Sequence, residues 1–70
     1  MDQLYFRIGN VPAWLPGETG ERTELHVSRD KGAAMALKSR SVSIPANSPE
    51  RDQKIAEWRA EMRDMRAIEV

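Results

Sequence analysis

Residues 47–66 read NSPERDQKIAEWRAEMRDMR and carry the clearest secondary-structure pattern in the chain. Asn47 and Ser48 are residue types that cap helices, and Pro49 is favoured at the first helical position. No residue after Pro49 breaks a helix before the end of this segment. The sequence therefore predicts a C-terminal helix over about residues 49–66.

The side chains of this helix fall into separate rows at 100° per residue. The apolar row, which we expect to pack on the rest of the protein, consists of Ile55, Trp58, Met62 and Met65. The basic row consists of Arg59, Arg63 and Arg66, and the acidic row consists of Glu57, Glu61 and Asp64. Like charges four residues apart cost a few tenths of a kcal/mol per pair in an isolated helix. The segregation thus indicates a directional charged surface, unless Glu18, Glu21 and Glu24 neutralise the arginines within the fold.

Residues 3–8 and 23–28 each alternate apolar and polar side chains, which predicts two strands with one face on a core and one face in water. The apolar face, which would pack on the C-terminal helix, consists of Leu4, Phe6, Ile8, Leu25 and Val27. On the same pattern, Glu24 and His26 are expected to face water.

Residues 10–22 are predicted to form a loop, because Gly9-Asn10 is a turn sequence and the segment itself contains two prolines and two glycines. Trp14 and Leu15 lie between the two prolines. Trp14 would either fold back to cover the core or form an exposed anchor, which the prolines would hold at low entropy cost.

Residues 30–40 allow two interpretations. The sequence Asp30-Lys31-Gly32 could form a tight hairpin turn that leads into a returning strand. The alternative is a short helix capped by Ser28 or Asp30, which the following alanine-rich residues favour. In either case residues 41–44 are expected to be extended.

These elements predict a single α+β domain over residues 1–70. Its small antiparallel sheet, of two or three strands, would pack on one long C-terminal helix; on the helical interpretation of residues 30–40, a short helix would lie in the middle of the chain. A chain of 70 residues buries only about 60% of its unfolded surface, so its core is expected to be thin.

The composition argues against several kinds of site. The chain has no cysteine and one histidine, so we expect neither a disulfide nor a metal site. No catalytic arrangement of side chains and no phosphate-binding glycine motif is present, so we expect no catalytic residues, no cofactor and no enzyme activity. Without a signal peptide or an apolar run of about 20 residues, the expected setting is cytoplasmic and away from membranes.

Charge suggests nucleic-acid binding as an alternative function. The formal net charge is zero, but residues 25–44 hold four basic residues and one acidic residue. The candidate nucleic-acid contacts are Arg29, Lys31, Lys38 and Arg40. A neutral chain is nevertheless unlike a typical nucleic-acid binder, whose affinity comes largely from net positive charge.

Protein binding fits the composition better, because tryptophan, tyrosine, arginine and methionine are frequent at interfaces. The candidate partner-binding residues are Trp14, Leu15, Arg59, Arg63 and Arg66, and an acidic partner surface would complement the arginines. We expect a non-enzymatic modulator that inhibits or regulates a larger protein machine by occupying a surface. This profile resembles in kind the small accessory proteins that phages and mobile elements direct against host transcription, defence or replication complexes. A homo-oligomeric structural or assembly subunit, such as a homodimer, is a third hypothesis.

Overall fold

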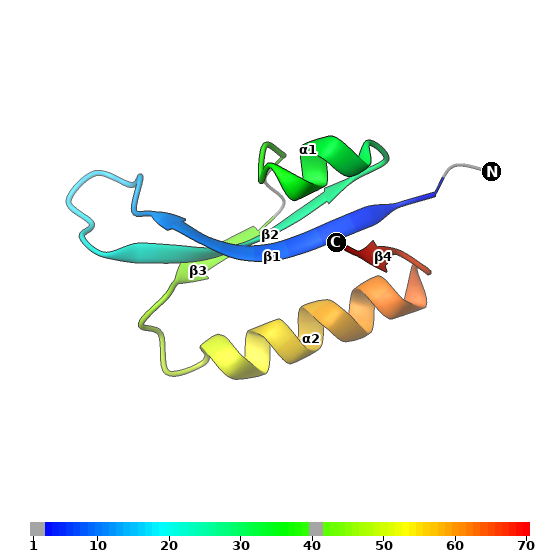
Figure 1. The fold of residues 1–70 in the computed structure, drawn as a ribbon. Helices are drawn as coiled ribbons and strands as arrows, with labels where there is room; N and C mark the ends of the chain where they lie inside the picture. Colours follow the sequence, from blue (N-terminus) through cyan, green and yellow to red (C-terminus); the bar gives the residue numbers. More distant parts are fainter. Residues whose placement is uncertain (1–2, 40–41) are drawn as a thin grey trace.

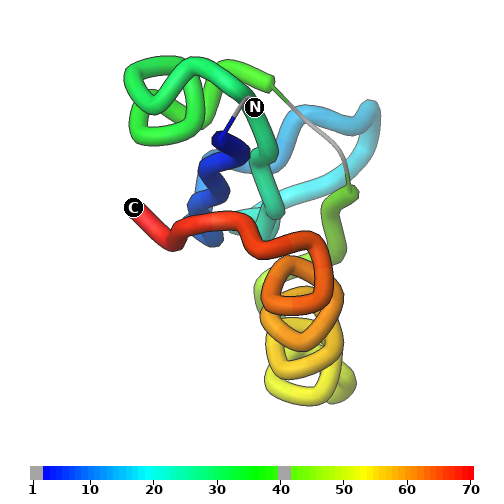
Figure 2. The backbone as a smooth tube through the Cα atoms, turned by 90° about the vertical axis from the view of Figure 1, so that its right-hand side faces the viewer, coloured from blue at the N-terminus to red at the C-terminus, as the bar shows by residue number. Residues whose placement is uncertain are grey.

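A computed structural model describes residues 3–39 and 42–70 as a sheet with one helix on each face (Figures 1 and 2). The elements are β1 (Tyr5–Pro12), β2 (Glu21–Ser28), α1 (Lys31–Met35), β3 (Val42–Pro45), α2 (Arg51–Asp64) and β4 (Ile68–Glu69). The strand order is β3-β2-β1-β4. The α+β class and the long C-terminal helix are confirmed, but the sheet is mixed and has four strands.

β1 and β2 form a long antiparallel hairpin in which Ile8 lies opposite Leu25. The first strand runs four residues past its predicted end, because Gly9 and Asn10 belong to the ladder and form no turn. Leu37 packs closely over Gly9, since a Cβ atom there would lie 2.9 Å from Cδ1 of Leu37 and this side chain would have to shift. The connecting turn covers residues 13–20 and differs from the predicted loop over 10–22.

The core lies between the sheet and α2, as the apolar pattern predicts. It consists of Phe6, Leu25, Trp58 and Met62, with Ile8, Val27, Ile44, Ile55 and Ala67 packed around it. On α2, Trp58 and Met62 are buried, whereas Arg59, Ala60 and Glu61 are exposed. Met65 is 52% exposed, so the apolar row ends before the last residue assigned to it.

Both ends of α2 lie inside the predicted bounds. Ser48 begins a turn before the helix, since its carbonyl accepts a hydrogen bond from the Arg51 amide and its Oγ accepts one from the Glu50 amide. At the other end, Arg66 adopts a φ of 58° and leaves the helix. This reversal lets residues 68–69 return beside β1 as β4. The sequence analysis missed β4 because two residues show no alternation.

α1 lies on the opposite face of the sheet from α2 (Figure 2). The Asp30 carboxylate caps it by accepting a hydrogen bond of 2.9 Å from the Gly32 amide, as the helical interpretation expects. One prediction about this face is wrong: Glu24 and His26, expected to face water, are both completely buried. The alternation in β2 therefore separates an apolar buried face from a polar buried face.

Candidate functional site

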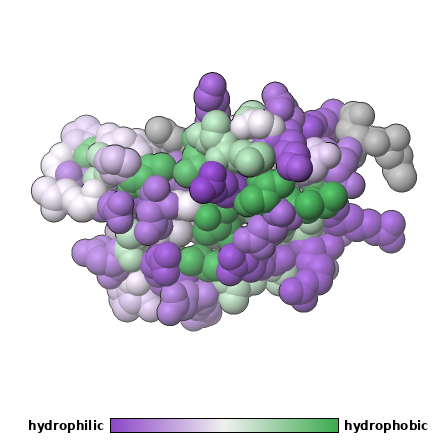
Figure 3. All heavy atoms as spheres, in the orientation of Figure 1, coloured by the Kyte–Doolittle hydropathy of each residue, from purple (hydrophilic) through white to green (hydrophobic). Residues whose placement is uncertain are grey.

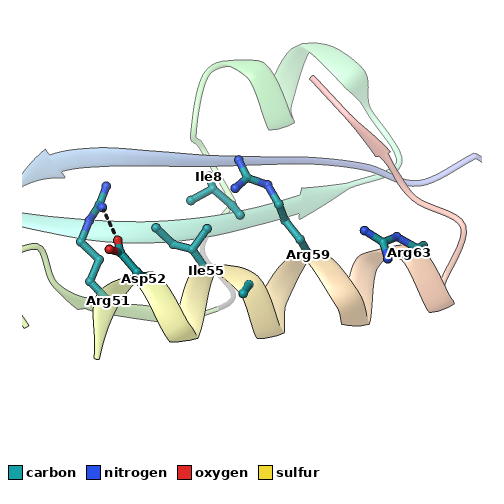
Figure 4. Close-up of a pocket in the computed structure, with 7 residues that line it drawn as sticks. Ile8, Arg51, Asp52, Ile55, Arg59 and Arg63 are labelled. Carbon is teal, nitrogen blue, oxygen red and sulfur yellow. Dashed lines mark hydrogen bonds and ion pairs between the residues drawn. The ribbon is translucent and has the colours of Figure 1, made fainter. Parts of the chain in front are cut away.

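An open groove runs between β1 and α2, where apolar atoms are visible between polar side chains (Figures 3 and 4). It has a volume of about 630 Å³. Its lining consists of Ile8, Arg51, Asp52, Ile55, Ala56, Arg59 and Arg63. Ile8 and Ile55 point toward each other from the sheet and the helix, and the arginines lie on either side of them (Figure 4). The groove thus combines an apolar centre with a predominantly basic rim.

Arg51 is held at one end of the groove by contacts to both α2 and the sheet. Its Nε donates a hydrogen bond of 3.0 Å to Oγ1 of Thr23, and its Nη1 lies 3.3 Å from Oδ1 of Asp52. The Thr23 hydroxyl in turn donates to Oδ1 of Asn10 across the hairpin. These bonds fix the guanidinium while leaving further N–H donors on it unused.

Arg59 is held further along the groove by the C-terminal strand. Its Nε and Nη2 donate to the two carboxylate oxygens of Glu69 over 3.1 and 2.9 Å. This hydrogen-bonded pair raises the pKa of Arg59 above its ordinary value and lowers the pKa of Glu69 below 4.5. A smaller hollow of about 210 Å³ continues the groove past the pair, and Arg59 and Arg63 line it too. The same two arginines therefore contribute to both hollows.

The Arg59–Glu69 pair predicts that the attachment of β4 depends on pH. Because the folded-state pKa of Glu69 lies below 4.5, its stabilisation is present above that pH and is lost as the pH falls through the lowered pKa. Both side chains are about half exposed, so the effect should be small, about 0.2–1 kcal/mol. Amide exchange at Ile68 and Val70, corrected for intrinsic exchange, should accelerate relative to core amides as the pH falls through this lowered pKa. A Glu69→Gln variant should not show this acceleration of exchange at low pH. If both proteins show the same pH dependence of exchange, the Arg59–Glu69 pair is not its cause.

The structure divides the predicted partner-binding residues between separate places. Arg59 and Arg63 line the groove, whereas Arg66 follows the end of α2 and accepts a hydrogen bond at its carbonyl from Nε2 of Gln3. Trp14 and Leu15 lie in the hairpin turn, with exposed fractions of 44% and 42%. The five residues therefore do not form one continuous row.

Trp14 is attached to the face of the sheet that α1 covers. Its Nε1 donates a hydrogen bond of 2.6 Å to Oε2 of Glu24, and the Arg22 guanidinium lies 5.5 Å from the centre of its ring system. Glu24 faces away from Leu25 and the α2 core, since neighbouring strand residues point to opposite faces. The sheet thus lies between Trp14 and the groove. Trp14 is neither a full core lid nor a free anchor, because it is half exposed and tied to a buried carboxylate.

A second unexpected feature is the buried pair below Trp14. Nε2 of His26 lies 2.7 Å from Oε1 of Glu24, and both side chains are inaccessible to solvent. Within residues 3–39 and 42–70, Nδ1 of His26 has no hydrogen-bond partner. Through Glu24, this pair connects Trp14 in the hairpin turn to the buried polar face of β2.

The candidate nucleic-acid contacts lie around α1, on the other side of the sheet from the groove. Arg29, Lys31 and Lys38 are exposed there. Arg40 falls outside the described residues. The basic segment and the arginine-lined groove are thus two distinct surfaces that mutation can separate.

The sequence analysis did not assign Ile8 or Arg51 to a site. The arginine could have been found, since residues 51, 55, 59 and 63 are spaced by four and so follow one side of a helix. The role of Ile8 depends on which strand edge β4 leaves open, and local pattern does not contain that information.

Neither protein families, curated protein sequences nor solved structures gave a match to this chain. In the part of the chain that the structure describes, no three or more His, Asp or Glu side chains are grouped as metal ligands would be. None of the helices described has the length and apolar character to cross a membrane.

Proposed function

We propose that the protein is a non-enzymatic binding module that recognises an acidic surface of another protein and regulates that partner by covering it. The observation that supports this function is the convergence of Arg51, Arg59 and Arg63 around Ile8 and Ile55 in one open groove. An apolar centre within a charged rim is the usual arrangement of a protein interface.

Arg63 is the side chain best placed to meet a partner. It is exposed, it lines both hollows, and its guanidinium forms no hydrogen bond or ion pair with the described residues. Arginine binds carboxylates through two parallel hydrogen bonds, which gives an acidic partner both affinity and orientation. The Ile8–Ile55 centre would add the desolvated contact that charged rims do not provide.

We expect Arg63→Glu to slow association with the partner about tenfold or more and to weaken its salt dependence, because rim charges act mainly on encounter. Lys38→Glu is the matched control, since it makes the same charge change at an exposed site beyond the sheet. The immobilised parent, Arg63→Glu and Lys38→Glu proteins are compared by quantitative mass spectrometry of proteins retained from native lysate. The retained candidates are then purified, and surface-plasmon kinetics are measured against all three.

The opposite pattern would contradict the proposal. If Lys38→Glu abolishes retention while Arg63→Glu does not, and nuclease treatment removes the retained material, the basic segment carries the function. A steep salt dependence of DNA or RNA binding by the parent protein would then identify a nucleic-acid-binding regulator.

A further inference from the structure

Most of one edge of the sheet is open along β1. β4 pairs only with Tyr5 and Phe6, and among the residues that the structure describes, the rest of β1, Arg7–Pro12, has a strand neighbour on its β2 side alone. Its length corresponds to about 20 Å of extended chain. Such an edge presents unpaired backbone groups to any segment that can add as a further strand.

The hydrogen-bond pattern shows which backbone groups face the open edge. The carbonyls of Leu4 and Phe6 accept hydrogen bonds of 2.9 Å from the amides of Ile68 and Val70 in the β4 segment. Backbone groups alternate in direction along a strand, so the N–H and C=O groups of Ile8 and Asn10 point the same way. Pro12 is the next even-numbered residue of β1. It has no backbone N–H, but an N–H at this position would face the open edge, so the β1–β2 ladder loses no hydrogen bond.

The hydrogen bonds between β1 and β2 agree with this assignment of the backbone groups. The Ala13 amide donates a hydrogen bond of 3.0 Å to the Gly20 carbonyl, which places odd-numbered residues in the bonds between β1 and β2. The backbone groups of even-numbered β1 residues therefore point to the other side, where those of Ile8 and Asn10 lie beyond the pairing with β4.

β4 shows how an added strand meets the groove. Glu69 lies opposite Phe6, on the face of the sheet that α2 covers, and its carboxylate binds Arg59. The side chains of a strand placed further along β1 would alternate in the same way. Those facing α2 would lie over Ile8 and Ile55, between the guanidinium groups of Arg51, Arg59 and Arg63 (Figure 4).

We propose that the open edge of β1 binds an extended acidic segment of the partner protein as an additional strand, in line with β4. The backbone of the segment pairs with Ile8 and Asn10, and its acidic side chains facing α2 bind the groove arginines. This inference rests on the proposed function and specifies the partner of the same groove. Pairing through the backbone supplies affinity, and the alternating side chains supply selectivity for acidic segments.

The first experiment uses a capped heptapeptide of alternating glutamate and valine, with a lysine-for-glutamate peptide as control. It is titrated into isotope-labelled protein, and the backbone amides are followed by NMR. The expected result is that the amides of Ile8 and Asn10 shift and become at least tenfold more protected from exchange. The lysine peptide should have no effect. If the glutamate peptide leaves both amides unchanged, the strand-addition proposal is wrong.

The second experiment separates backbone pairing from charge. Asn10→Pro removes an N–H that faces the open edge, and Asn10→Ala removes the same side chain, with its bond to Thr23, while keeping that N–H. Asn10→Ala is the reference variant, because it measures what loss of the side chain and of its bond to Thr23 costs the binding of the peptide. Asn10→Pro should bind the peptide at least tenfold more weakly than Asn10→Ala, with circular dichroism showing that both variants are folded; equal binding by the two variants would contradict backbone pairing at this position.

An N-methyl scan of the peptide gives a readout that does not depend on the stability of the protein. Methyl groups at alternate backbone nitrogens should abolish binding, and those at the intervening nitrogens should not. Binding that depends on Arg63 but not on N-methylation would retain the proposed function and overturn strand addition. If binding depends on N-methylation but is unchanged by Arg63→Glu, the proposal that the partner is acidic would be wrong instead.

A second copy of this chain could also occupy the edge. Concentration-dependent protection of the Ile8 and Asn10 amides in the protein alone, together with a dimer in sedimentation, would show that occupant. That result would overturn the proposal that a separate acidic segment binds here.

Discussion

Replacing Trp58 by alanine is expected to lower the free energy of unfolding by about 3–5 kcal/mol. Trp58 is 6% exposed and packs with Phe6, Leu25 and Met62 between α2 and the sheet. Its loss would leave a cavity that this thin core has little means to fill. A chain of this length has a total stability of roughly 4–10 kcal/mol, so this substitution would remove from about a third to all of it.

Urea unfolding followed by far-ultraviolet circular dichroism measures this change. Met65→Ala provides the control, because it also truncates a large side chain of the apolar row but at a position that is 52% exposed. The control should change stability by no more than about 0.5 kcal/mol. If Trp58→Ala, like the control, changes the free energy of unfolding by no more than about 0.5 kcal/mol, the core does not depend on Trp58.

The features predicted best from the sequence are those whose evidence is local. Trp58 and Met62 recur at helical spacing, and this pattern correctly placed them against the sheet. The short helix after Asp30 also depends on neighbouring residues, but these left a hairpin turn with a returning strand open as well, and α1 covers only Lys31–Met35 of the expected residues 30–40. Charge segregation along α2 similarly pointed to Arg59 and Arg63, which the structure brings to one groove.

The features that were missed depend on contacts between distant segments. β4 forms because the chain reverses at Arg66 and reaches β1 over 60 residues away in sequence, and two residues leave no periodic signal. The burial of His26 was missed for a related reason. Alternation in β2 shows that its two faces differ, but not that α1 covers the polar one.

The open edge of β1 illustrates the same limit at the site. Its strand character is local, and its availability depends on where β4 stops. No property of residues 7–12 alone distinguishes an edge from an interior position, apart from the proline at the end of the segment. The groove could therefore be anticipated as a charged helix surface, but not as a surface beside an unpaired strand.

Glu24→Ala is expected to be the other strongly destabilising substitution, with a loss of about 3–5 kcal/mol. The carboxylate is completely buried and binds Nε2 of His26 with one oxygen and Nε1 of Trp14 with the other. Its removal leaves a buried imidazole without this partner and releases the indole that fixes the hairpin turn. An unsatisfied buried polar group costs about 1–3 kcal/mol, more than the net value of about 0.5–1.5 kcal/mol of the bond it has lost.

Urea unfolding at neutral pH measures the loss of stability, and Glu21→Ala is its control, because Glu21 lies on the same strand with an exposed side chain. The control should stay within about 0.5 kcal/mol of the parent protein. Glu24→Gln should lose less than Glu24→Ala, since the amide keeps the shape and one oxygen acceptor for Trp14 or His26. The indole N–H resonance of Trp14 gives an independent readout and should move toward its value in a solvated side chain in Glu24→Ala alone. If Glu24→Ala instead matches the Glu21→Ala control in stability and leaves that resonance in place, the buried pair does not fix the turn, and other contacts of Trp14, among them its contact with Arg22, hold it.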